Sequence, residues 1–282
     1  MSSNRKGGII VAEILTLREP SPSSPLNRII EDNNSLTTLP LAVNYRWATA
    51  SKMIQSGVIK ISECDVFGES LNYAFYGHPA FKPDEPDNNT RNSLFYPICF
   101  IIDTAKFSVA NVFPFDTGAF KRDMYKAHHI PADYSIDELG LCPNITKVKG
   151  YIQMVYQSNE DYLLYRPHIV EDTEKYPGVF NAILSLVNEK GTEAIDSRAR
   201  TIEFISREDI LIDEAVIAII CPRSFVEAYD VKKSIKALRR KGISIVYYFE
   251  GGVSLTEFIG MIRNEAYKYY QKRGYIKRVG GD

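Results

Sequence analysis

The sequence predicts a protein of the α+β or α/β class, with a mixed β-sheet flanked by helices. Two runs rich in β-branched and aromatic residues, Phe95 to Ile102 and Glu214 to Cys221, have the composition of buried strands. Pro177 to Lys190 has the apolar spacing of an amphipathic helix. Strand and helix patterns alternate along the C-terminal part of the chain, as in a mixed sheet. The 282 residues are 45% hydrophobic, which is enough for a substantial core.

The N-terminal part of the chain contains four short candidate elements. Ile9 to Leu17 is apolar and fits either a first strand or a docking helix, and Leu41 to Tyr45 fits a strand. Trp47 to Ser56 has helical composition, and Gly57 stands where a C-terminal cap is expected. Val58 to Ile61 predicts a further strand.

The stretch from Asp65 to Phe81 is rich in aromatic residues and is the centre of the predicted site. A turn at its start leads into Glu69 to Tyr76, which fits a buried strand or a short helix. A Gly-His-Pro sequence then ends the element, because proline removes a backbone donor and restricts the preceding residue. We expect Tyr73, Tyr76 and His78 to line one pocket wall that faces the helix ending at Gly57.

The later elements follow from the same signals of period, capping and chain breaks. Ser254 and Glu257 form a capping box, which predicts a helix start. The predictions are strands at Phe95–Ile102, Thr201–Ile205, Glu214–Cys221 and Ile243–Phe249, helices at Phe120–His129, Asp133–Gly140, Pro177–Lys190, Ser224–Arg240 and Ser254–Tyr270, and a strand or helix start at Lys147–Val155. We expect the strands at 216–220 and 243–249 to share one sheet.

Composition and charge narrow the class of protein. A net charge of -1 gives no overall electrostatic reason to bind nucleic acid. The four cysteines are far apart, without the spacing of a zinc site or a disulfide framework, which favours a reduced cytoplasmic protein. No apolar run approaches the length of a membrane span, and we expect no signal peptide and no membrane partner.

Three short motifs carry a resemblance to a known family. The helix end Ile54-Gln-Ser-Gly-Val58, a tyrosine at position 73 or 76, and the sequence Arg200-Thr-Ile-Glu-Phe-Ile205 occur in that order. Together they resemble the ADP-ribosyltransferase fold, most closely the branch that includes DNA-modifying DarT-type toxins. The resemblance covers residues 40–222, so the expected division is an N-terminal extension (1–39), an ADP-ribosyltransferase-like core (40–222) and a C-terminal α/β extension (223–282). It implies a bacterial or phage-related protein, with phage defence as its setting.

The resemblance also implies roles for individual residues, with NAD as the substrate. Glu203 would be the catalytic carboxylate that stabilises an oxocarbenium-like transition state. Arg200 or Arg46 would pair with the pyrophosphate, and the ring of Tyr73 or Tyr76 would stack on nicotinamide, close to His78. Asn44, or Tyr45 by a one-residue shift, stands where the family has a histidine, and Arg46 stands where it has a threonine. An asparagine can still hydrogen-bond a ribose hydroxyl.

Several alternatives remain open at this point. Period-two alternation places Thr201, Glu203 and Ile205 on one side of a strand, where Glu203 is either a surface carboxylate paired with arginine 198 or 200, or a pocket residue. The pocket could belong to a transferase with a nucleic-acid or protein acceptor, to a non-catalytic nucleotide sensor, or to a protein-interaction module. A metal-dependent nuclease using Asp65, Glu69 and Asp116 is a weaker alternative. The basic cluster at 232–241 fits a solvated helix face or a phosphate contact.

Overall fold

The computed structural model describes residues 14–80, 92–125, 130, 134–168, 176–188, 197–251 and 254–277. The predicted strand or helix over residues 9–17 therefore lies mostly outside the described part of the chain, and its described end, 14–17, is irregular. The sequence also predicts a loop at 82–92, of which only Asn92 is described, and a helix cap at Gly191, which lies outside the described residues.

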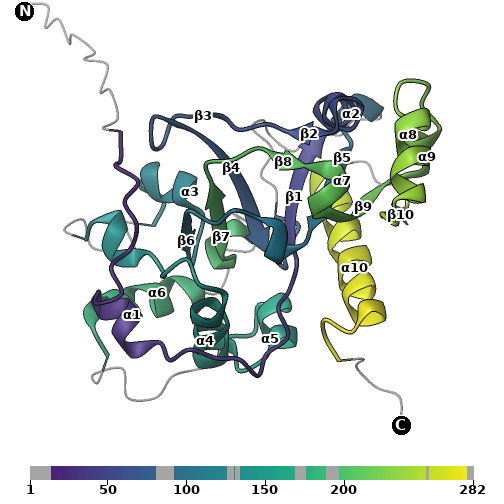
Figure 1. Cartoon of the computed structure of the whole chain (residues 1–282). Helices are drawn as coiled ribbons and strands as arrows, with labels where there is room; N and C mark the ends of the chain where they lie inside the picture. The colour runs from purple at the N-terminus through teal and green to yellow at the C-terminus, as the bar shows by residue number, and fades with distance from the viewer. Residues whose placement is uncertain are drawn as a thin grey trace, which may run out of the picture.

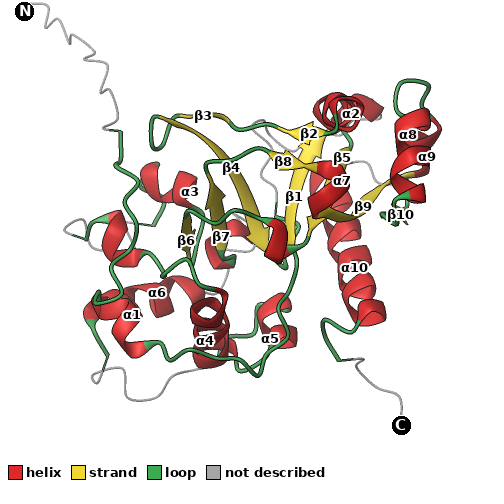
Figure 2. Cartoon of the chain, in the orientation of Figure 1, coloured by secondary structure: helices red, strands yellow, loops and turns green. Residues whose placement is uncertain are grey.

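The described residues form ten strands and ten α-helices, whose arrangement is drawn in Figures 1 and 2. The strands are β1 (Leu41–Arg46), β2 (Val58–Ile59), β3 (Ser62–Cys64), β4 (Glu69–Tyr76), β5 (Pro97–Ile102), β6 (Asn111–Phe113), β7 (Glu203–Ser206), β8 (Ile210–Leu211), β9 (Val216–Pro222) and β10 (Ser244–Tyr248). The helices are α1 (Pro25–Ile29), α2 (Trp47–Ser56), α3 (Thr117–Lys121), α4 (Ile145–Tyr156), α5 (Asn159–Leu163), α6 (Gly178–Asn188), α7 (Ile212–Ala215), α8 (Arg223–Glu227), α9 (Lys232–Arg240) and α10 (Leu255–Arg273).

One mixed sheet organises the fold, which confirms the predicted α+β class with flanking helices. Its strand order is β10-β9-β5-β1-β4-β7-β6, and β3 joins it as a further partner of β4. Neighbouring strands are antiparallel except β9 and β10, which are parallel. The strand-helix-strand-helix order predicted for the C-terminal part, with both strands in one sheet, is confirmed. The division of the chain at residues 39 and 222 stays a prediction.

The helices gather around both ends of the sheet. Helices α4, α5 and α6 lie together at the end that carries β6 and β7, whereas α8 and α9 lie beside β10 at the other end (Figure 1). Helix α10 runs along β5, β9 and β10. The central strand β5 is buried at every position, as its apolar sequence predicts.

Two glycines adopt the left-handed conformation at the ends of α2 and β4. Gly57 ends α2 in the left-handed conformation, with φ 77° and its N–H donating to the carbonyl of Met53, as a C-terminal cap does. Gly77 follows β4 with φ 67°, and a Cβ there would lie 2.8 Å from the side chain of Leu39. The segment after β4 therefore turns tightly against the loop that precedes β1.

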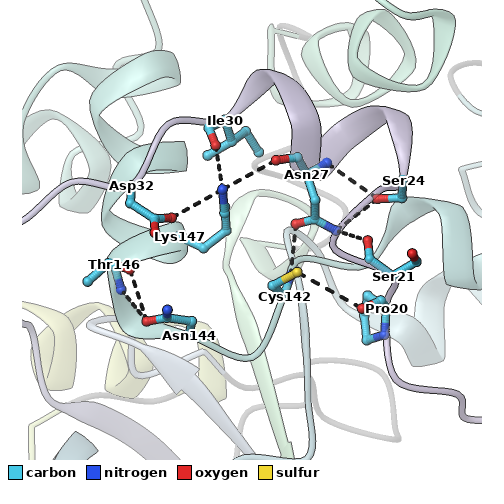
Figure 3. A network of polar contacts seen from close by, with 10 residues as sticks. All are labelled: Pro20, Ser21, Ser24, Asn27, Ile30, Asp32, Cys142, Asn144, Thr146 and Lys147. Carbon is cyan, nitrogen blue, oxygen red and sulfur yellow. Dashed lines mark hydrogen bonds and ion pairs between the residues drawn. The ribbon is translucent and has the colours of Figure 1, made fainter.

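The N-terminal segment is held to α4 by a network of polar contacts (Figure 3). Lys147 Nζ donates to the carbonyl of Ile30 at 2.6 Å and forms an ion pair with Asp32 at 3.1 Å. The side chain of Asn27 donates to the carbonyl of Gly140 at 3.1 Å, and its Oδ1 accepts from the backbone of Cys142 at 2.9 Å. These bonds tie α1 and the residues after it to residues 140–142 and to the first turn of α4.

Several element predictions need correction. The helix expected at 120–129 is α3, which begins at Thr117 because Asp116 caps it and ends at Lys121. The helix expected at 133–140 is a short 3-10 turn, Ile136–Leu139. The ambiguous stretch 147–155 lies within helix α4, and the single helix expected at 224–240 is two helices, α8 and α9. In each case a local cap or break decided the boundary more than composition did.

Candidate functional site

A cavity of about 350 Å³ lies over three adjacent strands of the sheet, β1, β4 and β7. The register pairs Ala42 with Phe75 and Phe75 with Glu203, so these residues share one face. Because side chains alternate along a strand, Asn44 and Tyr73 lie on that same face. Three of the residues predicted from the sequence, Asn44, Tyr73 and Glu203, therefore line one cavity.

Glu203 lies at the base of the cavity, and only 2% of its surface is exposed. Its Oε2 accepts two hydrogen bonds from Thr117, from the backbone N–H at 3.1 Å and from the hydroxyl at 2.7 Å. Glu203 is thus a pocket residue, and the alternative of a surface carboxylate on an edge strand is wrong. Strand β7 is flanked by β4 and β6, which is why its first residue is enclosed.

A second carboxylate lies near Glu203. Asp116 caps α3 by accepting from the N–H of Gly118 at 2.9 Å, and it forms an ion pair with Arg198 Nε at 2.9 Å. Desolvation by burial, with the nearby charge of Asp116, raises the pKa of Glu203 to about 8. A carboxyl group whose pKa is raised in this way favours its protonated form near neutral pH. Arg198 forms its ion pair with Asp116, and its charge also favours the ionised form of Glu203.

Tyr73 forms the wall of the cavity next to Glu203. Its Oη lies 2.7 Å from Sγ of Cys64 in a hydrogen bond. Desolvation by burial raises the pKa of Tyr73 far above its ordinary value, and the charge of Glu203 raises it further. The ring is therefore a neutral phenol whose hydroxyl is oriented by Cys64.

Asn44 presents a polar atom without a described partner. Its side chain is 8% exposed, and its Nδ2 donates to the carbonyl of Ala80 at 3.0 Å. Its Oδ1 is buried and accepts no hydrogen bond from any residue that the structure describes. A buried acceptor left unsatisfied costs about 1–3 kcal/mol, so a donor on a bound molecule would be stabilised here.

Tyr76 and His78 do not line this cavity, so the expectation of one shared wall is wrong for both. Tyr76 is three positions from Tyr73 and therefore points to the opposite face of β4, where its hydroxyl accepts from the N–H of Leu39 at 2.8 Å. His78 is buried, with Nε2 3.1 Å from the carbonyl oxygen of Tyr162 and its ring stacked on Tyr165. Both residues belong to the packing on the other side of the sheet.

The two arginines predicted to bind a pyrophosphate also lie outside the cavity. The guanidinium of Arg46 lies over the ring of Phe95, 5.6 Å from its centroid. Arg200 is buried in the turn before β7, and its charge lowers the otherwise raised pKa of Tyr156. Arg122 and Arg198 line the cavity in their place.

Sequence reasoning missed Asp116, Thr117 and Cys64 as parts of this site. The signal for the first two was present, because an Asp followed by Thr-Gly is a helix-capping sequence. Nothing local linked that cap to Glu203, which is 86 residues further along the chain from Thr117. Of the acids grouped for a nuclease, Asp116 lines the cavity, whereas Glu69 does not and pairs with Arg207 at 2.8 Å.

Within the described ranges, no three His, Cys, Asp or Glu side chains are grouped so as to hold a metal ion. None of the described helices has the length and apolar character needed to cross a membrane. Comparison with models of protein families, with curated proteins and with solved structures finds no match for this chain.

Proposed function

We propose that this protein is ADP-ribosyltransferase-like and binds NAD or a related nucleotide in the cavity over β1, β4 and β7. The observation that carries the proposal is the meeting of Asn44, Tyr73 and Glu203 on one face of three neighbouring strands. Tyr73 and Glu203 come from two of the motifs on which the family resemblance rests, and Asn44 stands where the family has a histidine. A volume of about 350 Å³ suits the nicotinamide riboside part of NAD, with the rest of the dinucleotide at the mouth.

Each wall of the cavity has a role in this proposal. The ring of Tyr73 stacks on nicotinamide, and Oδ1 of Asn44 accepts a hydrogen bond from a ribose hydroxyl. Arg122, which is exposed and lines the mouth, takes the pyrophosphate role that the sequence assigned to Arg46 or Arg200. Arg198 is held in its ion pair with Asp116, which leaves Arg122 for this role.

Because the pKa of Glu203 is raised, Glu203 must lose a proton before it can act as a carboxylate. The nicotinamide ring of NAD is a cation, and a cation beside a carboxyl group favours its ionised form. Binding NAD therefore expels the proton, and the carboxylate formed can stabilise positive charge on the ribose as the bond to nicotinamide breaks. Nicotinamide leaves as a neutral molecule, and the acceptor nucleophile releases one proton when the new bond forms.

The test compares NAD cleavage by the wild type and by Glu203→Gln, which keeps the shape of the side chain but has no charge. We expect the variant to lose a factor of about 10²–10³ in rate. The matched control is Glu63→Gln, which makes the same change at an exposed position on the neighbouring strand β3. Equal cleavage by the wild type and Glu203→Gln would remove Glu203 from the mechanism.

The same raised pKa favours a second candidate, a nucleotide sensor that binds without cleavage. A protonated carboxyl group is a hydrogen-bond donor and is compatible with a neutral ring. A sensor of this kind would bind NADH at least as tightly as NAD, and more tightly as the pH falls below 8. Calorimetry with both nucleotides at several pH values, together with an assay for released nicotinamide, separates the two candidates.

A further inference from the structure

Strand β10 forms an open edge of the sheet, at the end opposite β6. It pairs with β9 on one side, and no strand among the described residues pairs with its other side. Ser244, Ile245 and Val246 are half-buried, whereas every residue of the interior strand β5 is buried. Alternate backbone groups along such an edge face outward and can pair with a further strand.

The surface around β10 is strongly basic, although the whole chain has a net charge of -1. Residues 223–250 contain seven basic and three acidic residues. The cations reach the strand itself: Arg239 donates to the hydroxyl of Tyr247, Arg223 lies over the ring of Tyr247 at 5.7 Å, and Arg273 donates to Ser244 Oγ at 2.8 Å. Both ends of β10 therefore carry positive charge. The exposed basic residues of α9 are Lys232, Lys233, Lys236, Arg239 and Arg240.

Exposed aromatic side chains occur in the same segment, 223–250. Tyr229 is 100% exposed, and Phe249, which directly follows β10, is 75% exposed. Tyr247 is 38% exposed within the strand. Large apolar side chains that remain exposed beside an open edge are typical of a protein–protein contact.

We propose that the β10 edge binds an extended, acidic segment of another protein, which adds to the sheet as a further strand. Backbone hydrogen bonds would supply affinity, and the acidic side chains of the partner would face the cations at both ends of β10 and on α9. A second copy of this chain is disfavoured as the partner, because its own basic edge would meet an equally basic one. A nucleic acid would satisfy the charges but not the repeating backbone donors and acceptors of a strand edge.

The proposed edge is separate from the cavity, since two strands, β9 and β5, lie between β10 and β1, the nearest strand that lines the cavity. The experiment uses the full chain and a fluorescent peptide of alternating Glu and Val as the probe. We expect binding that weakens at high salt. A probe N-methylated at every residue lacks the backbone donors on both of its edges and should bind at least about tenfold more weakly.

A protein variant tests the charge independently. Lys232→Glu, Lys236→Glu and Arg240→Glu together should weaken binding of the Glu-Val probe by about tenfold or more. The matched control makes the same change of charge at one arginine and two lysines that are exposed on other parts of the chain: Arg28→Glu, Lys60→Glu and Lys106→Glu. This control should bind as the wild type does, and circular dichroism checks that both variants are folded.

Four results would overturn the proposal. They are no binding of the Glu-Val probe, equal binding of the N-methylated probe, equal loss in the control variant, and preferential binding of a single-stranded oligothymidine. Equal binding of the N-methylated probe, or preferential binding of oligothymidine, would identify a general polyanion surface. Loss of NAD cleavage bears only on the cavity, so the two proposals fail separately.

Discussion

The buried carboxyl group of Glu203 makes the stability of this protein depend on pH in a specific window. Its pKa is about 8 in the folded chain against an ordinary value of 4.5. Between these values the folded chain holds a proton that the unfolded chain has released, so the free energy of unfolding falls as the pH rises. Below pH 4.5 both states are protonated, and the group contributes no pH dependence.

Replacing Glu203 with Gln removes this dependence but keeps an acceptor for the two hydrogen bonds from Thr117. One pKa unit corresponds to about 1.4 kcal/mol. Between pH 4.5 and pH 7 the free energy of unfolding of the wild type therefore falls by at most about 3 kcal/mol. We therefore expect Glu203→Gln to be close to the wild type at pH 4.5. It should become more stable by about 1–3 kcal/mol at pH 7, with no further gain above pH 8.

The measurement is urea unfolding of both proteins from pH 5 to 8, with the free energy difference plotted against pH. The exposed substitution Glu63→Gln serves as the control and should leave the wild-type profile unchanged. A free energy difference between Glu203→Gln and the wild type that stays constant across this range would show that Glu203 is ionised in the folded chain. A variant that is less stable at pH 7 would contradict the reasoning as well.

Three further predictions concern neighbouring residues. Burial lowers the pKa of His78 to about 3, so stability should fall as the pH drops from 6.5 towards 3, and His78→Phe should flatten that part of the unfolding profile. Tyr76→Phe leaves the buried N–H of Leu39 without its acceptor, which should cost about 1–3 kcal/mol in thermal or urea unfolding while nucleotide binding stays unchanged. Thr117→Val removes the hydroxyl that stabilises the carboxylate of Glu203, so the pKa of Glu203 should rise further. In the urea measurements above, the fall in the free energy of unfolding should then continue above pH 8.

The sequence predicted those elements whose signals are local. Strand β9 is a run of β-branched residues, and α2 ends at a glycine that adopts the left-handed cap conformation. The same holds for α10, whose cap Ser254 accepts from the N–H of Glu257 as the capping box predicts. Short elements with weaker signals, such as α3, were misplaced because a single capping side chain sets their start.

The site was predictable only in part, because its geometry depends on strand pairing. Glu203, Tyr73 and Asn44 were identified, although nothing local shows that their strands are neighbours. Tyr76 was assigned to the wrong side, yet strict alternation from Tyr73 already places it on the opposite face. Arg200 was misplaced for a different reason: it lies in a 3-10 turn, Ser197–Arg200, where strand alternation does not apply.

The position of β7 between β4 and β6 has a consequence for how the chain matures. Strands β1, β4 and β6 all leave the ribosome well before β7, which must then insert between two strands already made. Until it does, β4 has an exposed edge, and the nascent chain is open to pairing with other chains. Contacts between segments so distant in sequence form slowly, so β7 should be among the last parts of the sheet to dock. A newly synthesised chain therefore gains its acidic pocket in the same late step that closes its sheet.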